Sequence, residues 1–174
     1  MRSDPELREF FAKLSSGLSV AAFLQALEAI YGYTRASGMI HDFRLGRGQV
    51  KKLRDEVTPL ARFVRRNASP DDIISMPISD PPDFVIAVSS NRRNGIECTI
   101  AGARERLFTM RELNKTGRAR AFLGLSDDSP HATFQAAMAS ARIAHAAEQI
   151  VNVVSRDIEI SLRRKSAGNY GDFF

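Results

Sequence analysis

Residues 81–100 read PPDFVIAVSSNRRNGIECTI, and this stretch decides the fold that we expect. Residues 84–88 form a nearly continuous apolar run, which is typical of a buried strand. Residues 96–100 alternate between apolar and polar side chains, which is typical of a strand with one buried face. The polar residues between the two runs end in Asn94-Gly95, a pair that favours a turn. The stretch therefore predicts two neighbouring strands joined by a turn.

Two carboxylates, Asp83 and Glu97, stand on these two strands. If Asp83 lies opposite Glu97 or Thr99, both acids point to the same side of the hairpin, because side chains alternate along a strand. The apex of the turn would then fall near residues 90–91, whereas a symmetric turn on residues 94–95 would separate the acids. Carboxylates that converge on one point repel each other and need a cation, and their hard oxygen atoms suit Mg²⁺ or Mn²⁺.

Each acid also has an ordinary interpretation. Asp83 follows two prolines, so its side chain could simply cap a turn. Glu97 could be a solvent-facing residue of a sheet that has one wet face. Cys98 alternates away from Glu97 and is expected to be a small core residue. We favour a site because the two acids occur together and in this order.

Helices are predicted before this stretch. Asp-Pro at residues 4–5 is a typical helix start, and Ser19 can cap a second helix. A third helix is expected over residues 49–66, where Pro59 should kink or split it. Residues 73–78 then indicate a short strand. The N-terminal third of the chain is thus expected to be helical.

Further helices are predicted after the stretch. Residues 103–115 indicate a helix that ends near Gly117, and residues 130–165 indicate one long helix rich in alanine. Phe-Phe at residues 173–174 looks like the opening of a strand, so the chain either ends there or is cut short. The order of elements predicts an α/β fold, with a small mixed β-sheet flanked by helices and preceded by N-terminal helices.

PDF at residues 82–84 and IECT at residues 96–99 resemble the signature of PD-(D/E)xK, or restriction-endonuclease-like, nucleases. More narrowly, they are similar to bacterial and phage variants with PDF and IExT motifs, and the resemblance covers roughly residues 49–174. It implies an αβββαβ core over residues 48–174, which either ends natively or is truncated before or within its last strand, and an N-terminal helical extension over residues 1–47. It also implies metal-dependent hydrolysis of phosphodiester bonds in nucleic acid, with DNA as the expected substrate.

The resemblance assigns Mg²⁺, or Mn²⁺, to Asp83 and Glu97. It adds Glu56 of the preceding helix as a further metal-binding acid, with Asp55 as the neighbouring choice. Hard carboxylate oxygens are the ligands that these ions prefer. The bound ion would hold a phosphate, activate water and offset charge in the transition state.

The chain departs from the family at Thr99, which stands where the family has a lysine two residues after the glutamate. Threonine carries no charge and cannot stabilise a pentavalent phosphate in the same way. Some relatives supply the lysine from a neighbouring helix, and Lys115 and Lys165 are the candidates, with Lys165 slightly preferred. The implied catalytic set is therefore Asp83, Glu97, Thr99, Lys165 and Lys115. Without a substitute lysine, the protein would bind metal or nucleic acid and cut nothing.

The charge balance is mildly basic. Lysine and arginine number 25 against 20 for aspartate and glutamate, which gives a net charge of +5, and the sequence pI is about 9.8. This excess is compatible with a phosphate-bearing partner. The candidate nucleic-acid-binding residues lie in the turn and on the helix that follows the hairpin: Arg92, Arg93, Arg104, Arg111 and Arg118. A solvated charged face is the ordinary alternative.

The remaining composition limits the setting. No apolar run is long enough to span a membrane, so no membrane partner is expected. Cys98 is the single cysteine and cannot form an internal disulfide, so a reducing, cytoplasmic setting is expected. Three functions stay open: a metal-dependent nuclease, a catalytically inactive nucleic-acid-binding module on the same fold, and a helical protein-interaction module that forms a homodimer.

Overall fold

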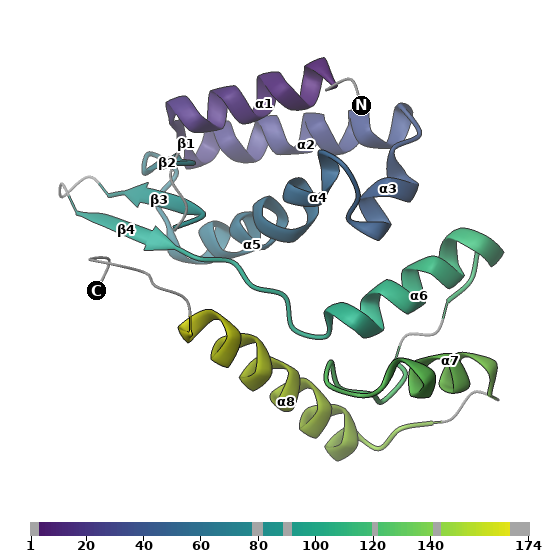
Figure 1. Cartoon of the computed structure of the whole chain (residues 1–174). Coiled ribbons are helices and arrows are strands. Elements are labelled where there is room, and N and C mark those ends of the chain that lie inside the picture. The colour runs from purple at the N-terminus through teal and green to yellow at the C-terminus, as the bar shows by residue number, and fades with distance from the viewer. Residues whose placement is uncertain (1–3, 78–81, 89–91, 120–121, 141–143, 168–174) are drawn as a thin grey trace. The chain divides into compact units, whose positions relative to one another are not determined.

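A computed structural model of the chain describes residues 4–77, 82–88, 92–119, 122–140 and 144–167 (Figure 1). The chain divides into two compact units at the bond between Cys98 and Thr99. The first unit holds helices α1 to α5 and all four strands of the described residues, and the second holds helices α6, α7 and α8. The division does not fall at the expected boundary between residues 47 and 48.

The first two helices begin where their capping residues predict. Helix α1 (Pro5–Ser16) starts after Asp4, whose carboxylate accepts a hydrogen bond of 3.1 Å from the backbone N–H of Leu7. Helix α2 (Val20–Ala36) starts after Ser19, whose hydroxyl accepts a hydrogen bond of 3.2 Å from the amide three residues later. Side-chain acceptors of this kind satisfy amides that the helix itself leaves without a partner. Both predicted helix starts are confirmed.

The predicted third helix is interrupted. After the short helix α3 (Ile40–Leu45), the chain forms α4 (Val50–Lys52), a π-helical turn η1 (Leu53–Val57) and α5 (Thr58–Asn67). Pro59 has no N–H, and its ring clashes with the carbonyl four residues back, so the helix widens just before it. The distortion expected at Pro59 is present as this π turn, but the helical residues run on from Val50 to Asn67, so the helix is not split.

The sheet is a meander of four short strands in the order β1-β2-β3-β4. They are β1 (Leu18–Ser19), β2 (Ile73–Ser75), β3 (Phe84–Ala87) and β4 (Arg93–Ile96), and each neighbouring pair is antiparallel. The described strands therefore form a purely antiparallel sheet, where a mixed sheet was expected. The expected last strand at residues 173–174 lies outside the described residues.

The last of the three strands predicted over residues 73–100 lies earlier in the chain than expected. It was expected over residues 96–100, but β4 ends at Ile96 and includes Asn94-Gly95, which was expected to be part of the turn. Its partner β3 begins at Phe84. Pro82, two residues earlier, has no N–H to donate to the ladder, and among the described residues the pairing of β3 with β4 ends at Phe84 and Ile96.

One hydrophobic core unites the first unit. It contains apolar side chains from α1, α2, α4, η1 and α5 together with Ile74, Phe84 and Ile86 of the sheet. Phe23 of α2 and Phe84 of β3 are the largest fully buried side chains of this core. Phe134 is also fully buried, but it belongs to the second unit. The helices of residues 1–47 thus bury their apolar faces against the same core as the strands, which is why they are not a separate unit.

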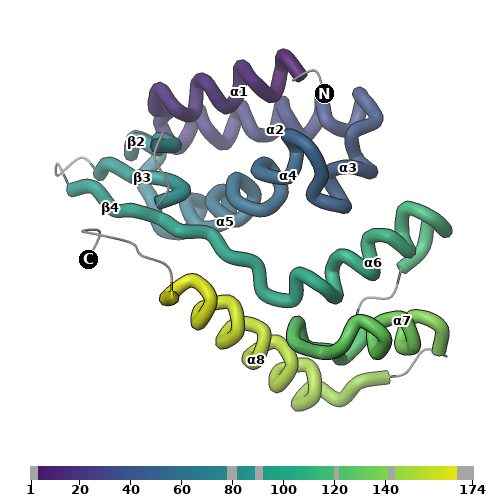
Figure 2. The backbone as a smooth tube through the Cα atoms, in the orientation of Figure 1, coloured from purple at the N-terminus to yellow at the C-terminus, as the bar shows by residue number. Residues whose placement is uncertain are grey.

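The second unit differs from the single long helix that was expected over residues 130–165. Helix α6 (Ala103–Thr116) ends at Gly117 as predicted, with a positive φ of 72°. Residues 130–165, however, contain two helices, α7 (His131–Ala139) and α8 (Ala147–Ser166). In the tube of Figure 2, α7 and α8 are two separate helical coils.

The break between α7 and α8 is made by extended residues. Ser140 has φ −75° and ψ 166°, and residues 144–146 are not helical. Within this stretch the ring of His145 packs edge-on against Phe122, with the ring centroids 5.0 Å apart. A tertiary contact of this kind outweighs the helix propensity of alanine, which is only a weak preference per residue. In the part of the chain that the structure describes, no helix is long and apolar enough to cross a membrane.

Candidate acid site at the base of the hairpin

The register of β3 and β4 places the two acids across from each other. Phe84 pairs with Ile96, so the same register places Asp83 opposite Glu97. The backbone N–H of Asp83 donates a hydrogen bond of 3.3 Å to Oε2 of Glu97. This is the register that a shared site required, and it centres the hairpin on residue 90, although residues 89–91 lie outside the described residues.

The Asp83 carboxylate is held from across the hairpin. Its Oδ2 accepts a hydrogen bond of 2.7 Å from the backbone N–H of Cys98, and the residue is only 8% exposed. A hydrogen bond to a charged acceptor is among the stronger kinds. Asp83 therefore does more than cap its own turn, because its carboxylate ties the start of β3 to the chain leaving β4.

Glu56 reaches this region through its backbone. The thiol of Cys98 donates to the carbonyl oxygen of Glu56 at a sulfur–oxygen distance of 3.5 Å. Glu56 lies in the π turn η1, a kind of helical irregularity that is frequent at functional sites. The cysteine was expected to be a small core residue, and it is half-buried and packed against the core.

The structure separates Glu56 from its neighbour Asp55. The Asp55 carboxylate forms a two-point ion pair with Arg54, and Arg54 also donates to the carbonyl oxygen of Arg44 at 2.8 Å. Asp55 is thus part of the packing of η1 against the last turn of α3. Of the two alternatives, Glu56 is the one with a contact to the hairpin.

Lys52 is a residue that the sequence interpretation missed. Its Nζ lies 3.3 Å from Oε2 of Glu56, one helical turn away. The spacing of four residues on a predicted helix was a usable signal, since such pairs meet on one helix face. The predicted substitutes Lys115 and Lys165 both follow the third strand, whereas Lys52 precedes the sheet, one turn before Glu56.

The other predicted catalytic residues belong to the second unit. Thr99 is exposed and lies outside any strand, so the alternation expected for it is absent. Lys115 is exposed in the last turn of α6, and Lys165 is half-buried in the last turn of α8. Their roles stay predictions.

The predicted nucleic-acid-binding arginines are exposed side chains on both units. Arg92 and Arg93 lie at the start of β4, and Arg111 and Arg118 lie on and just after α6. Arg104 differs, because its guanidinium donates to the carbonyl oxygen of Ser129 at 2.6 Å and lies over the ring of Phe134. Arg104 therefore helps to pack the second unit, whatever else it binds.

The acid pair supplies carboxylate oxygens, the donors that Mg²⁺ prefers. Within the described residues, no three histidine, cysteine, aspartate or glutamate side chains are grouped closely enough to hold a metal ion. A Mg²⁺ ion at this site would therefore have the carboxylates of Asp83 and Glu97 as its protein ligands. Two protein ligands are a common number for Mg²⁺, which usually keeps several of its waters.

The comparisons with known proteins identify no relative. No family model, curated protein or solved structure matches the chain. The likeness of residues 82–84 and 96–99 to PD-(D/E)xK nucleases therefore stays a prediction. What the chain does has to be inferred from the acid pair and from the side chains around it.

Proposed function

We propose that the protein hydrolyses phosphodiester bonds in nucleic acid, with DNA as the expected substrate, at a Mg²⁺- or Mn²⁺-dependent site on Asp83 and Glu97. One observation carries this proposal. The two acids lie opposite each other at the base of the hairpin, and backbone N–H groups join each carboxylate to the other strand. An arrangement of this kind orients both carboxylates before any ligand arrives.

The electrostatics of the pair support a cation. Two carboxylates that face each other repel, and a nearby positive charge relieves this repulsion. The backbone donors of Asp83 and Cys98 supply part of the compensation. When bound, a divalent ion would polarise a phosphate and lower the pKa of a water. Asp83 and Glu97 would hold it; the described residues bring no third acid close enough to join them, so Glu56 is not part of the proposed ligand set.

Lys52 is our choice for the positive charge that Thr99 lacks. It lies in the same unit as the acids and pairs with Glu56, whose backbone contacts Cys98. An ammonium group there would neutralise developing charge on a phosphate oxygen and help to orient the attacking water. Lys115 and Lys165 stay as the alternatives.

The order of elements supports a restriction-endonuclease-like core. Along the chain, α5, β2, β3, β4 and α6 follow one another as α-β-β-β-α. The final strand of the proposed core falls on residues outside those described. We extend the proposal to a cytoplasmic setting, which suits the single thiol of Cys98, and to a homodimer, which would bring two such sites to one duplex.

The test is cleavage by the full chain. Labelled duplex DNA, single-stranded DNA and RNA are incubated with Mg²⁺, Mn²⁺ or EDTA. Asp83→Asn and Glu97→Gln should each lower metal-dependent cleavage about 100-fold or more, the scale seen when a group that stabilises the transition state is removed. Matched controls are Asp71→Asn and Glu6→Gln, which change exposed acids of the same unit. Undiminished cleavage by folded Glu97→Gln protein, or cleavage in EDTA, would refute the proposal.

A second function is favoured by Thr99, which is uncharged and lies outside the strand. On this alternative the chain binds nucleic acid without cutting it, and Arg92 and Arg93 contact phosphates. Its affinity would fall steeply with salt, because bound phosphates release counterions. Specific cleavage that disappears in Asp83→Asn excludes this alternative, whereas salt-sensitive binding with no cleavage under any divalent ion supports it.

A further inference from the structure

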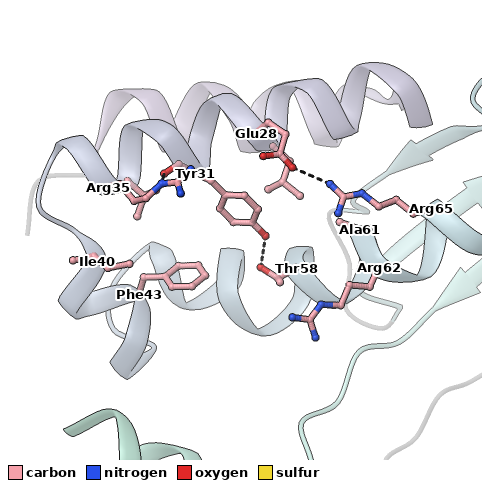
Figure 3. A pocket seen from close by; sticks show the side chains of 11 residues that line it. Glu28, Tyr31, Arg35, Ile40, Phe43, Thr58, Ala61, Arg62 and Arg65 are labelled. Atoms are coloured by element: carbon pink, nitrogen blue, oxygen red, sulfur yellow. Dashed lines mark hydrogen bonds and ion pairs between the residues drawn. The ribbon is translucent and has the colours of Figure 1, made fainter. Parts of the chain in front are cut away.

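The first unit contains a cavity away from the acid pair. It has a volume of about 420 Å³ and opens between α2, α3 and α5 (Figure 3). This volume lies within the range of small-molecule sites, roughly 300 to 1,000 Å³. None of the residues that line it is Asp83, Glu97, Glu56 or Lys52. The cavity is therefore a second candidate site, independent of the proposed nuclease centre.

One wall of the cavity is aromatic and fixed in place. The rings of Tyr31 and Phe43 meet edge to face, with centroids 6.2 Å apart and planes at 86°. The Tyr31 hydroxyl lies 2.6 Å from Oγ1 of Thr58, and Thr58 donates its proton to the carbonyl oxygen of Leu53 at 2.8 Å. Tyr31 is therefore the donor in the first bond, since Thr58 has only one proton. These bonds hold the ring ready for a flat ligand.

The rim of the cavity is positively charged. Arg35, Arg62 and Arg65 line it together with one acid, Glu28. Arg65 pairs with Glu28 at 2.9 Å, and within the described parts of the chain Arg35 donates only to the carbonyl oxygen of Tyr31 on its own helix. Among the described residues, Arg62 has no hydrogen-bond or ion-pair partner. Two guanidinium groups at the rim thus lack a carboxylate, and guanidinium groups favour phosphates and carboxylates.

We propose that this cavity binds a small organic anion with a flat aromatic body, the chemistry that a nucleoside monophosphate has. The aromatic body would pack against Tyr31 and Phe43, and the anionic group would pair with Arg62 of α5 or with Arg35 of α2. Inorganic phosphate alone would leave the apolar wall unfilled, and an uncharged aromatic compound would leave the arginines unpaired. A ligand that carries both features satisfies both parts of the cavity.

The binding test uses the full chain and calorimetric titration. The probes are the four ribonucleoside 5′-monophosphates, the four matching nucleosides and inorganic phosphate. We expect at least one monophosphate to bind with Kd below about 1 mM, and its nucleoside and inorganic phosphate each to bind at least about tenfold more weakly. Failure of all four monophosphates to bind, or equal binding of nucleoside and nucleotide, would overturn the proposal.

Two variants locate the binding. Arg62→Ala should weaken the monophosphate at least about tenfold, whereas Arg66→Ala, an exposed arginine on the same helix that does not line the cavity, should leave its affinity unchanged. Phe43→Leu keeps an apolar side chain but removes a ring, so it should weaken the nucleotide with no effect on inorganic phosphate. Equal losses in Arg62→Ala and Arg66→Ala would show general charge attraction instead of a site, and would also reject the proposal.

Discussion

The backbone N–H of Cys98 donates a hydrogen bond of 2.7 Å to Oδ2 of Asp83. Asp83 is thereby both a candidate metal ligand and a structural acceptor that ties β3 to the chain leaving β4. Removing one partner of a buried hydrogen bond leaves the other unsatisfied, which costs more than the bond itself contributes. Substitutions at this position should therefore separate the structural role of the side chain from its chemical role.

Asp83→Ala should lower the free energy of unfolding by about 1 kcal/mol, because the half-buried Cys98 amide loses its acceptor. Asp83→Asn retains an amide oxygen that can accept the same bond, so it should lose less stability. Both variants should lose metal-dependent cleavage. Urea unfolding of the two variants, beside the cleavage assay, checks this. Equal stability of Asp83→Ala and the natural chain would contradict a structural role for the bond.

Lys52 and its neighbour Lys51 give a matched pair for the missing lysine. Lys52 pairs with Glu56 at 3.3 Å, whereas Lys51 is exposed at the preceding position of the same helix. Lys52→Ala should lower kcat for cleavage about 100-fold, the scale expected for a charge that stabilises the transition state, and Lys51→Ala should leave kcat unchanged. Lys115→Ala and Lys165→Ala belong in the same series. A loss confined to either of these two would assign the role to the second unit.

The hairpin shows which part of a site can be predicted from sequence. Side chains alternate with a period of two, so the requirement that Asp83 and Glu97 share a side restricted the register to a few values. The observed register is one of them. The predicted strand ends were wrong because the pair Asn94-Gly95 favours a turn locally, whereas the structure places it inside β4. The strands stay paired as far as Val88 and Arg92, where the backbone N–H of Val88 donates to the carbonyl oxygen of Arg92 at 2.9 Å.

Tertiary contacts explain the other differences. Residues 130–165 have the composition of one long helix. His145, which lies between α7 and α8, packs against Phe122 instead of continuing the helix. The compact units divide at residues 98–99 and not at residue 47, because α1 and α2 bury their apolar faces on the same core as β3. Neither contact can be derived from local pattern, since each joins segments whose meeting depends on the whole fold.

The second unit contains an exposed ion pair that should make its stability depend on pH in the acidic range. Arg156 donates to Oδ2 of Asp128 at 2.5 Å, and this bond, with one from Ser126, lowers the pKa of Asp128 from 3.8 to about 2. A carboxyl group with a lowered folded pKa stabilises the fold at pH above its unfolded pKa. The contribution is therefore full above pH 3.8 and is lost as the pH falls toward about 2.

Asp128→Asn should abolish this part of the acid dependence. The difference in stability between the natural chain and the variant should shrink as the pH is lowered from 5 to 2, because the natural carboxyl becomes neutral as well. Added salt should shrink it at neutral pH, since both partners are exposed and screened. Thermal unfolding over this pH range measures the difference. A gap that stays constant with pH would exclude Asp128 as its source.

Helix α6 is capped by a residue distant in sequence. Its N-cap position is Gly102, which has no side chain to offer, and the Asp127 carboxylate instead accepts bonds from the amides of Ala103 at 3.0 Å and Arg104 at 2.8 Å. Asp127 is 4% exposed. A buried carboxylate at this end of a helix accepts hydrogen bonds from two amides, and its negative charge interacts favourably with the positive end of the helix dipole.

Asp127→Ala should therefore destabilise the second unit by about 2 kcal/mol, the upper end of the effect of removing a helix cap. Asp127→Asn keeps one acceptor and should cost about half as much. Because the two units need not unfold together, hydrogen exchange at the Ala103 and Arg104 amides is the direct measurement. Exchange there should accelerate in Asp127→Ala and stay slow in the control Glu148→Gln, which changes an exposed acid of the same unit. Unchanged exchange in Asp127→Ala would show that water replaces the cap without loss.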